Sequence, residues 1–199
     1  MKASLLVLLP LAGACGPLYV RDTRIEFQTD KALVGKSGTW HAVEVPDAPS
    51  PPTVWMQQAS GETSQFNLAL RESYPPLDAD VRVQLRAVEG ETDQGGGIAW
   101  RVQDVKNYYL VRWNPLEENL RAYKLVAGKR TTLLDKPLVT GPGWHSLRVW
   151  FSRDQVEVWF DGESQGEFAD STFALRGPVG LWTKADARTQ FDDLEIAEF

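Results

Sequence analysis

The fold is decided in residues 144–162, which read WHSLRVWFSRDQVEVWFDG. Two runs of alternating apolar and polar residues, both rich in β-branched and aromatic types, flank a short polar turn at Ser152, Arg153 and Asp154. Asp161-Gly162 then supplies a second turn of the kind that hairpins prefer. The stretch therefore predicts two antiparallel strands followed by a further strand.

Segments of the same kind lie on the N-terminal side of this hairpin. Residues 80–88, DVRVQLRAV, alternate most regularly, with Val81, Val83 and Leu85 on one face and Arg82 and Gln84 on the other. Residues 98–102, 107–113, 119–126 and 130–134 follow at a spacing of about ten residues, which is typical of a sandwich or barrel. No segment shows a sustained helical period. We expect an all-β fold of about twelve strands, more than the seven to nine of an immunoglobulin sandwich.

The chain closes with GLWTKADA at residues 180–187 and FDDLEI at residues 191–196. With the preceding strands, these segments resemble the concanavalin A-like lectin/glucanase superfamily, particularly the laminin G-like jelly rolls of secreted bacterial proteins and the 3-keto-disaccharide hydrolase family. The resemblance covers roughly residues 64–199. It implies a two-sheet antiparallel jelly-roll sandwich in which glycan binding is common and catalysis is optional.

Length and charge limit the classes of function. A chain of 199 residues with 43% hydrophobic content suits one domain. The net charge of -6 argues against a nucleic-acid partner, because phosphate binding needs a basic surface. We expect a signal segment over residues 1–15, a tether with short strands and a proline-rich loop over 16–58, and the main part of a single jelly-roll domain over 59–199.

The N-terminus indicates export. Lys2 precedes the apolar run SLLVLLPL at residues 4–11, and AGA at 12–14 is a small-residue cleavage pattern. Cys15, the only cysteine, follows directly and resembles the acylated residue of a bacterial lipobox, although Ala12 stands where leucine is usual. We expect a lipid anchor on Cys15 that attaches an extracytoplasmic envelope protein to a membrane. Simple secretion is the alternative.

Motifs for catalysis are missing from the sequence. The two histidines, His41 and His145, have no nucleophile or zinc-ligand pattern around them, and no Gly-x-Ser-x-Gly motif occurs. The carboxylate run of the superfamily's glucanases is also absent. Asp193 and Glu195 are its nearest approach, and the alternation of the last strand places them on a solvated face.

Asp192 is predicted to face inward with Leu194 and Ile196, where a carboxylate needs a partner. One option is a structural calcium ion held by oxygen ligands, which would be the only cofactor. The favoured option is hydrogen bonds from loop amides, or an ion pair with Lys184 or Arg188.

The favoured ligand site is a polar and aromatic surface on the strands at 98–126. If Trp100, Tyr109 and Trp113 belong to the core, alternation places four other residues on the exposed sheet face: Arg101, Tyr108, Arg112 and, two strands on, Lys124. Resemblance to the 3-keto-disaccharide hydrolases also implies an arginine at position 101. Where that family reads Asn-Ser-Gly, this chain reads Gly95-Gly96-Gly97, which argues against hydrolase activity.

A second candidate surface arises from the hairpin. A turn at Arg153 and Asp154 would pair Arg148 with Trp159 and Trp150 with Glu157, all on one side. Such a face suits a sugar ring, but the favoured explanation of the arginine over the indole is a cation-π pair that shields the sheet.

These observations predict an extracytoplasmic, lipid-anchored, non-catalytic module that binds a glycan or glycoconjugate. A glycoside hydrolase and a structural envelope protein without a small ligand are the alternatives.

Overall fold

The computed structural model describes residues 21–25, 27, 33–58 and 62–199. The predicted signal segment and Cys15 lie outside these residues. Over the described part of the chain the fold is all-β, and no helix there could span a membrane. The described residues contain fifteen strands: β1 Arg21–Ile25, β2 Val34–Ser37, β3 Trp40–Glu44, β4 Thr53–Gln57, β5 Phe66–Arg71, β6 Ala79–Glu89, β7 Gly96–Asp104, β8 Asn107–Asn114, β9 Asn119–Val126, β10 Lys129–Pro137, β11 His145–Ser152, β12 Gln155–Phe160, β13 Glu163–Ala169, β14 Val179–Lys184 and β15 Arg188–Glu198.

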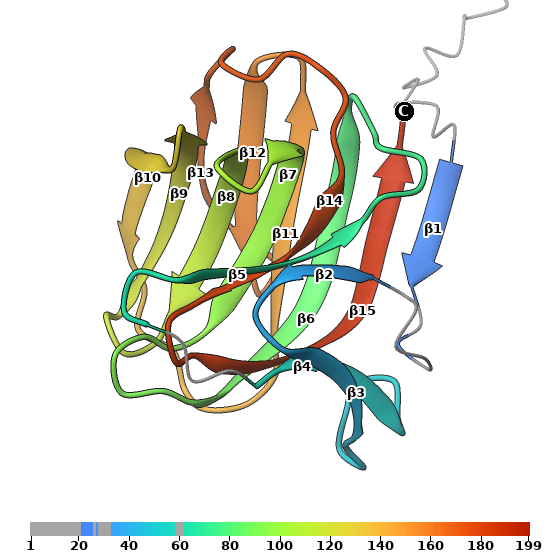
Figure 1. Cartoon of the computed structure of the whole chain (residues 1–199), viewed down its shortest axis with the longest axis vertical. Helices are drawn as coiled ribbons and strands as arrows, with labels where there is room; N and C mark the ends of the chain where they lie inside the picture. Colours follow the sequence, from blue (N-terminus) through green and yellow to red (C-terminus); the bar gives the residue numbers. More distant parts are fainter. Residues whose placement is uncertain (1–20, 26, 28–32, 59–61) are drawn as a thin grey trace, which may run out of the picture.

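The strands form two antiparallel sheets packed face to face (Figure 1). The first sheet has the order β13-β12-β11-β6-β15-β4-β3, with β1 paired to β15, and the second has the order β10-β9-β8-β7-β14-β5-β2. The expected two-sheet sandwich is therefore confirmed. Strands from the segment before residue 59 contribute to both sheets.

Apolar side chains from the facing sides of the two sheets form the core. Val81, Val83 and Leu85 of β6 are completely buried there, opposite Trp100 and Tyr109 of the second sheet. Arg82 lies exposed on the other side of β6, so the alternation read from residues 80–88 is confirmed.

The second sheet also carries a buried apolar cluster on its outer face, which includes Tyr108, Leu110 and Trp182. The sheet curls strongly toward this face. The guanidinium carbon of Arg130 on β10 lies 5.3 Å from the ring centroid of Phe66 on β5, although four strands separate β10 from β5 in the sheet. The molecule's own side chains thus fill much of the outer face.

Two bulges change the direction of side chains. One interrupts the pairing of β7 with β8 after Trp100, and Arg101 within it has a left-handed φ of 47°. The other lies in β15 at Asp193, where φ is 48°. An inserted residue breaks the alternation of faces, so residues beyond a bulge do not follow the pattern that precedes it.

Candidate functional site

The four residues predicted to gather on one exposed face do not do so. Tyr108 and Arg112 share the outer face of the second sheet, but both are buried, at 0% and 2% exposure. Arg101 is also buried, at 2%, and lies with Lys124 on the other side of the sheet. The expectation of an exposed polar surface formed by these four residues is therefore wrong.

The misplacement of Lys124 follows from strand register. Residues directly opposite each other on antiparallel strands share a face. Lys124 is paired with Tyr109, whose ring is in the core, whereas Leu125 is paired with Tyr108. Lys124 therefore lies on the inner side of the sheet, and its Nζ reaches Asp170 and Thr172 in the loop after β13.

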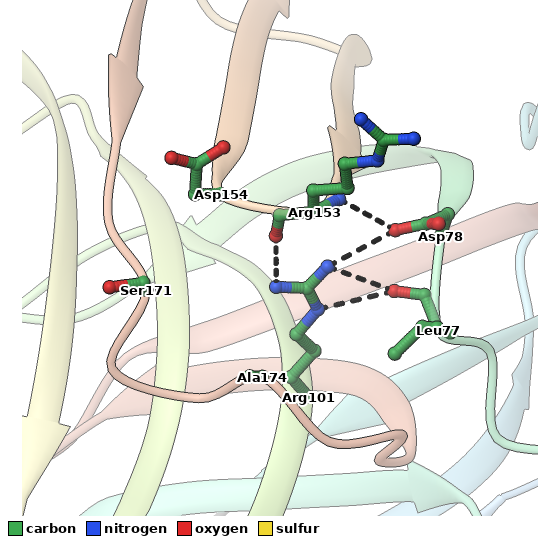
Figure 2. Close-up of a pocket in the computed structure, with 7 residues that line it drawn as sticks. All are labelled: Leu77, Asp78, Arg101, Arg153, Asp154, Ser171 and Ala174. Carbon is green, nitrogen blue, oxygen red and sulfur yellow. Dashed lines mark hydrogen bonds and ion pairs between the residues drawn. The ribbon is translucent and has the colours of Figure 1, made fainter.

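Arg101 departs from the expected face because of the bulge in β7. Its guanidinium reaches the end of the sandwich and lies over Phe151 of the first sheet, 5.4 Å from the ring centroid. Nε and Nη2 donate to the carbonyl of Leu77 at 3.2 and 3.0 Å, and Nη2 also donates to the Asp78 carboxylate at 3.2 Å (Figure 2). Nη1 donates to the carbonyls of Arg153 at 2.5 Å and Phe173 at 3.1 Å.

These contacts use all five N–H groups of the guanidinium. Arg101 thereby joins three segments that are distant in sequence: the end of the loop before β6, the turn between β11 and β12, and the loop between β13 and β14. It has no donor left for a ligand, so its role is to fix these loops.

The three loops enclose a cavity of about 360 Å³ at the end of the sandwich, which we call the end pocket. Its lining residues are Leu77, Asp78, Arg101, Arg153, Asp154, Ser171 and Ala174 (Figure 2). A volume of this size lies at the lower end of the range for small-molecule sites.

The loop after β13 is also held by a polar network around Asp170. Lys124 Nζ donates to one carboxylate oxygen at 2.5 Å, and the Tyr109 hydroxyl donates to the other at 2.7 Å. Burial acts to raise the pKa of Asp170, but hydrogen bonds from Lys124, Thr172 and Tyr109 outweigh it and hold the pKa well below its usual range. Burial also raises the pKa of Tyr109 to about 12, so its hydroxyl remains a donor.

Three polar groups of the end pocket retain hydrogen-bonding capacity. Among the described residues, neither the Ser171 hydroxyl nor the Arg153 guanidinium has a hydrogen-bond or ion-pair partner, and Asp154 uses only Oδ1, which accepts from Gln155. Asp78 differs in that its Oδ1 accepts two hydrogen bonds, from Arg101 and from the Arg153 amide, the latter at 2.8 Å, so this carboxylate is held as part of the pocket wall although its Oδ2 has no partner among the described residues. The pocket thus combines rigid walls with free donors and acceptors.

Tyr108 and Arg112 belong to a more enclosed environment. Trp182 Nε1 donates to the Tyr108 hydroxyl at 3.1 Å, and burial raises the pKa of Tyr108 to about 12. Arg112 donates through Nη2 to Glu117 at 2.8 Å, while its buried Nε and Nη1 have no partner among the described residues. Neither residue is part of the end pocket's lining.

The second predicted surface is present with the expected register. Arg148 is paired with Trp159 and Trp150 with Glu157, and all four lie half-buried on the outer face of the first sheet. The guanidinium carbon of Arg148 lies 4.1 Å from the Trp159 ring centroid, and Trp150 stacks on Phe199 at 5.8 Å.

Asp192 lies on the outer face of the first sheet, so its predicted inward orientation is wrong. The bulge at Asp193 separates it from the alternation that holds Leu194 in the core. Ser50 N donates to Asp192 Oδ2 at 2.7 Å, which confirms the predicted bond from a loop amide. Burial raises the pKa of Asp192. In the described part of the chain no three histidine, cysteine or acidic residues are grouped to hold a metal ion.

Sequence reasoning missed most of the end pocket. Arg153 and Asp154 were recognised only as a turn, and Asp78 and Ser171 carried no motif. The one available signal was general: loops of a sandwich cluster at its two ends and carry its binding sites.

Comparisons with known proteins support the fold. No protein-family model and no curated protein matches the chain, so the resemblance to 3-keto-disaccharide hydrolases is not confirmed. Among solved structures, carbohydrate-binding module CBM66 from Bacillus subtilis is similar at a TM-score of 0.68 and 17% identity, over 82% of this chain and 94% of that one. Cellulose-induced protein Cip1 is similar at a TM-score of 0.60 and 14% identity, over 83% of this chain and 87% of that one.

Galectin LEC-6 from Caenorhabditis elegans gives a TM-score of 0.50 at 8% identity, over 70% of this chain and 94% of that one. These neighbours are jelly-roll sandwiches, consistent with a concanavalin A-like fold. At such low identities the similarity establishes the fold and leaves the ligand to be argued from the site.

Proposed function

We propose that this protein is a non-catalytic carbohydrate-binding module that holds a sugar residue in the end pocket. The main observation behind this proposal is a cavity with walls held by hydrogen bonds. Three polar groups with unused hydrogen-bonding capacity, those of Arg153, Asp154 and Ser171, line it together with the apolar side chains of Leu77 and Ala174. The solved structures of similar fold include a carbohydrate-binding module and a galectin, which supports this class of ligand.

The lining of the pocket matches the chemistry of a sugar. Hydroxyl groups both donate and accept, as the Ser171 hydroxyl, the Arg153 guanidinium and the Asp154 carboxylate require. Leu77 and Ala174 offer apolar contact to the C–H faces of a ring. The two acidic side chains, Asp78 and Asp154, are balanced by Arg101 and Arg153, so a neutral sugar fits better than an ionised one.

Rigidity favours binding at this site. Arg101 fixes all three loops, and the Asp170 network fixes the third loop a second time. A pocket that is already ordered loses less conformational entropy when the ligand binds. Arg101 and Lys124 therefore contribute to the proposed function as supports for the pocket.

One observation favours the alternative of a glycoside hydrolase: Asp78 and Asp154 line the same cavity. Retaining and inverting enzymes both use two carboxyl groups, one of which must deliver a proton. Asp78, however, already accepts hydrogen bonds from the Arg101 guanidinium and the Arg153 amide, which join the loops that form the pocket. Loop positioning accounts for Asp78 without catalysis.

The proposed site is tested by a glycan array on the purified protein, followed by calorimetry with a retained sugar. Ser171→Ala should weaken binding about fivefold, and Arg153→Gln about tenfold or more, the usual cost of a neutral and a charged hydrogen bond. Thr131→Ala and Lys129→Gln, at exposed positions of β10, serve as matched controls and should bind as the unaltered protein does.

The same experiment separates the alternatives. Release of new reducing ends that stops in Asp154→Asn would establish a hydrolase. Retention of no glycan on the array would reject the carbohydrate-binding proposal and favour a structural envelope protein.

We also propose that the protein is extracytoplasmic and anchored by a lipid on Cys15. The support is the sequence alone: a short apolar run, a small-residue cleavage pattern and a single cysteine directly after it.

A further inference from the structure

A row of side chains crosses four strands on the outer face of the first sheet. The pairing of β12, β11, β6 and β15 places Trp159, Arg148, Arg82 and Glu195 directly beside one another. Neighbouring strands are separated by about 4.8 Å, so three steps make a row roughly 14 Å long. This row lies on a different surface from the end pocket.

Two cavities accompany the row. The first, of about 280 Å³, is lined by Arg82, Ser146, Arg148, Trp159 and Gly162. The second, of about 240 Å³, is lined by Asp22, Asp80, Arg82, Glu195 and Ala197. Because Arg82 lines both cavities, they meet at its side chain, and together we call them the outer trough.

Arg148 is fully engaged within the protein. Its Nε and Nη2 donate to the two carboxylate oxygens of Asp80 at 2.8 and 2.5 Å, and its guanidinium covers one face of Trp159. This network holds the Trp159 ring in a fixed position as one wall of the trough.

Arg82 and Glu195 behave differently. They stand directly opposite each other on β6 and β15, yet no ion pair joins them, and among the described residues neither side chain has a hydrogen-bond or ion-pair partner. Opposite charges directly across two strands stabilise the sheet when they pair. The trough thus presents a free donor group beside a free acceptor group.

The chemistry of the trough identifies the class of ligand. Asp22, Asp80 and Glu195 oppose Arg82 and Arg148, so the site carries little net charge in a chain whose net charge is -6. An anionic polymer is disfavoured. Hydroxyl groups can accept from Arg82 and donate to Glu195, and a sugar ring can contact the Trp159 wall.

We propose that the outer trough is a second binding site, which takes an internal segment of a neutral polysaccharide. Two cavities in series suit a chain of several sugar residues, whereas the single end pocket suits one residue. The inference goes beyond the proposed function, because it assigns a separate surface and an extended ligand.

The test is nuclear magnetic resonance titration of the labelled protein with neutral hexasaccharides of glucan, xylan, fructan and mannan. At least one should produce saturable shifts of the Trp159 indole N–H and the Arg82 Nε–H signals. Arg82→Gln and Glu195→Gln should each weaken that binding about fivefold or more. Lys129→Gln is the matched control for loss of an exposed positive charge and should bind normally.

The outcomes distinguish the two sites. Shifts confined to residues around Ser171 and Arg153, or unaltered affinity in both trough variants, would overturn the second site and leave the end pocket intact. Shifts of Trp159 and Arg82 that persist in Ser171→Ala would support the trough independently of the end pocket. If none of the four hexasaccharides moves the Trp159 and Arg82 signals, the proposed second site is rejected.

Discussion

Arg101 joins three loops through a single buried guanidinium. It adopts a left-handed backbone conformation, which for a non-glycine residue persists only where the surrounding structure over-determines it. Here the hydrogen bonds from the guanidinium to the carbonyls of Leu77, Arg153 and Phe173 hold the residue in this conformation. The charge is compensated by Asp78.

Replacing this arginine tests its structural role. Arg101→Met should lower the free energy of unfolding by about 3–5 kcal/mol, because removing one partner of a buried ion pair leaves the other partner and three carbonyls unsatisfied. Arg153→Met removes a guanidinium in the same pocket that has no side-chain partner among the described residues, so it should cost about 0.5 kcal/mol or less. Denaturant unfolding measures both, and equal midpoints would contradict the assigned role.

The lowered pKa of Asp170 should make the stability of the protein depend on pH. Its pKa in the folded protein lies below the unfolded value of about 3.9, so the ionised form stabilises the fold above roughly pH 4. This contribution is lost as the pH falls below 4 toward the folded-state pKa. Asp170→Asn should therefore be less stable than the unaltered protein at pH 7, with a smaller difference at pH 2.5. A difference independent of pH would refute the explanation.

Uninterrupted alternation placed the residues of β6 correctly from the sequence, whereas the face of Lys124 on β9 depended on its pairing with Tyr109, which alternation within one strand does not give. Val83 and Arg82 lie on the expected faces because β6 runs regularly through their positions. Arg101 and Asp192 could not be placed, because each stands at a bulge and no sequence signal marks an inserted residue. Single-residue insertions reverse the faces of everything beyond them.

At the scale of elements, the hairpin of β11 and β12 was predictable down to its register. Its two-residue turn at Arg153 and Asp154 leaves one pairing that keeps the core residues Leu147, Val149 and Val158 on the same side. The loop sequences did not constrain in this way which loops lie next to one another. The end pocket is formed by three of them, and their meeting depends on sheet packing that the sequence does not display.

Because β6 alternates regularly, substitutions at the adjacent positions 82 and 83 should affect the stability of the fold very differently. Val83→Asp would place an unpaired carboxylate in the dry interface between the sheets and should cost more than about 4 kcal/mol or prevent folding. The neighbouring Arg82→Gln should change stability by about 0.5 kcal/mol or less. Circular dichroism during denaturation reports both, and similar midpoints would disprove the assigned faces.

At the scale of the whole molecule, the sandwich offers two kinds of surface for ligands. The curled second sheet fills much of its outer face with its own side chains, such as Arg130 over Phe66. The end of the sandwich and the outer face of the first sheet retain cavities. Of the four residues that alternation selected first, only Arg101 lines the end pocket, whereas the outer trough includes Arg148 and Trp159 of the second predicted surface.

Anchoring is a prediction about the whole chain. If Cys15 is acylated, the full protein expressed in a bacterium should partition with membranes, and Cys15→Ser should not carry lipid. Mass spectrometry of the mature N-terminus measures the modification directly. An unmodified N-terminus in the unaltered protein would show simple secretion or another route.

The central claim is that the end pocket holds a sugar residue, and a crystal structure with a glycan retained on the array tests it most directly. We predict a sugar ring against Leu77 and Ala174, with hydroxyl groups bonded to Arg153, Asp154 and Ser171. A structure in which the bound glycan leaves the end pocket empty would contradict the account.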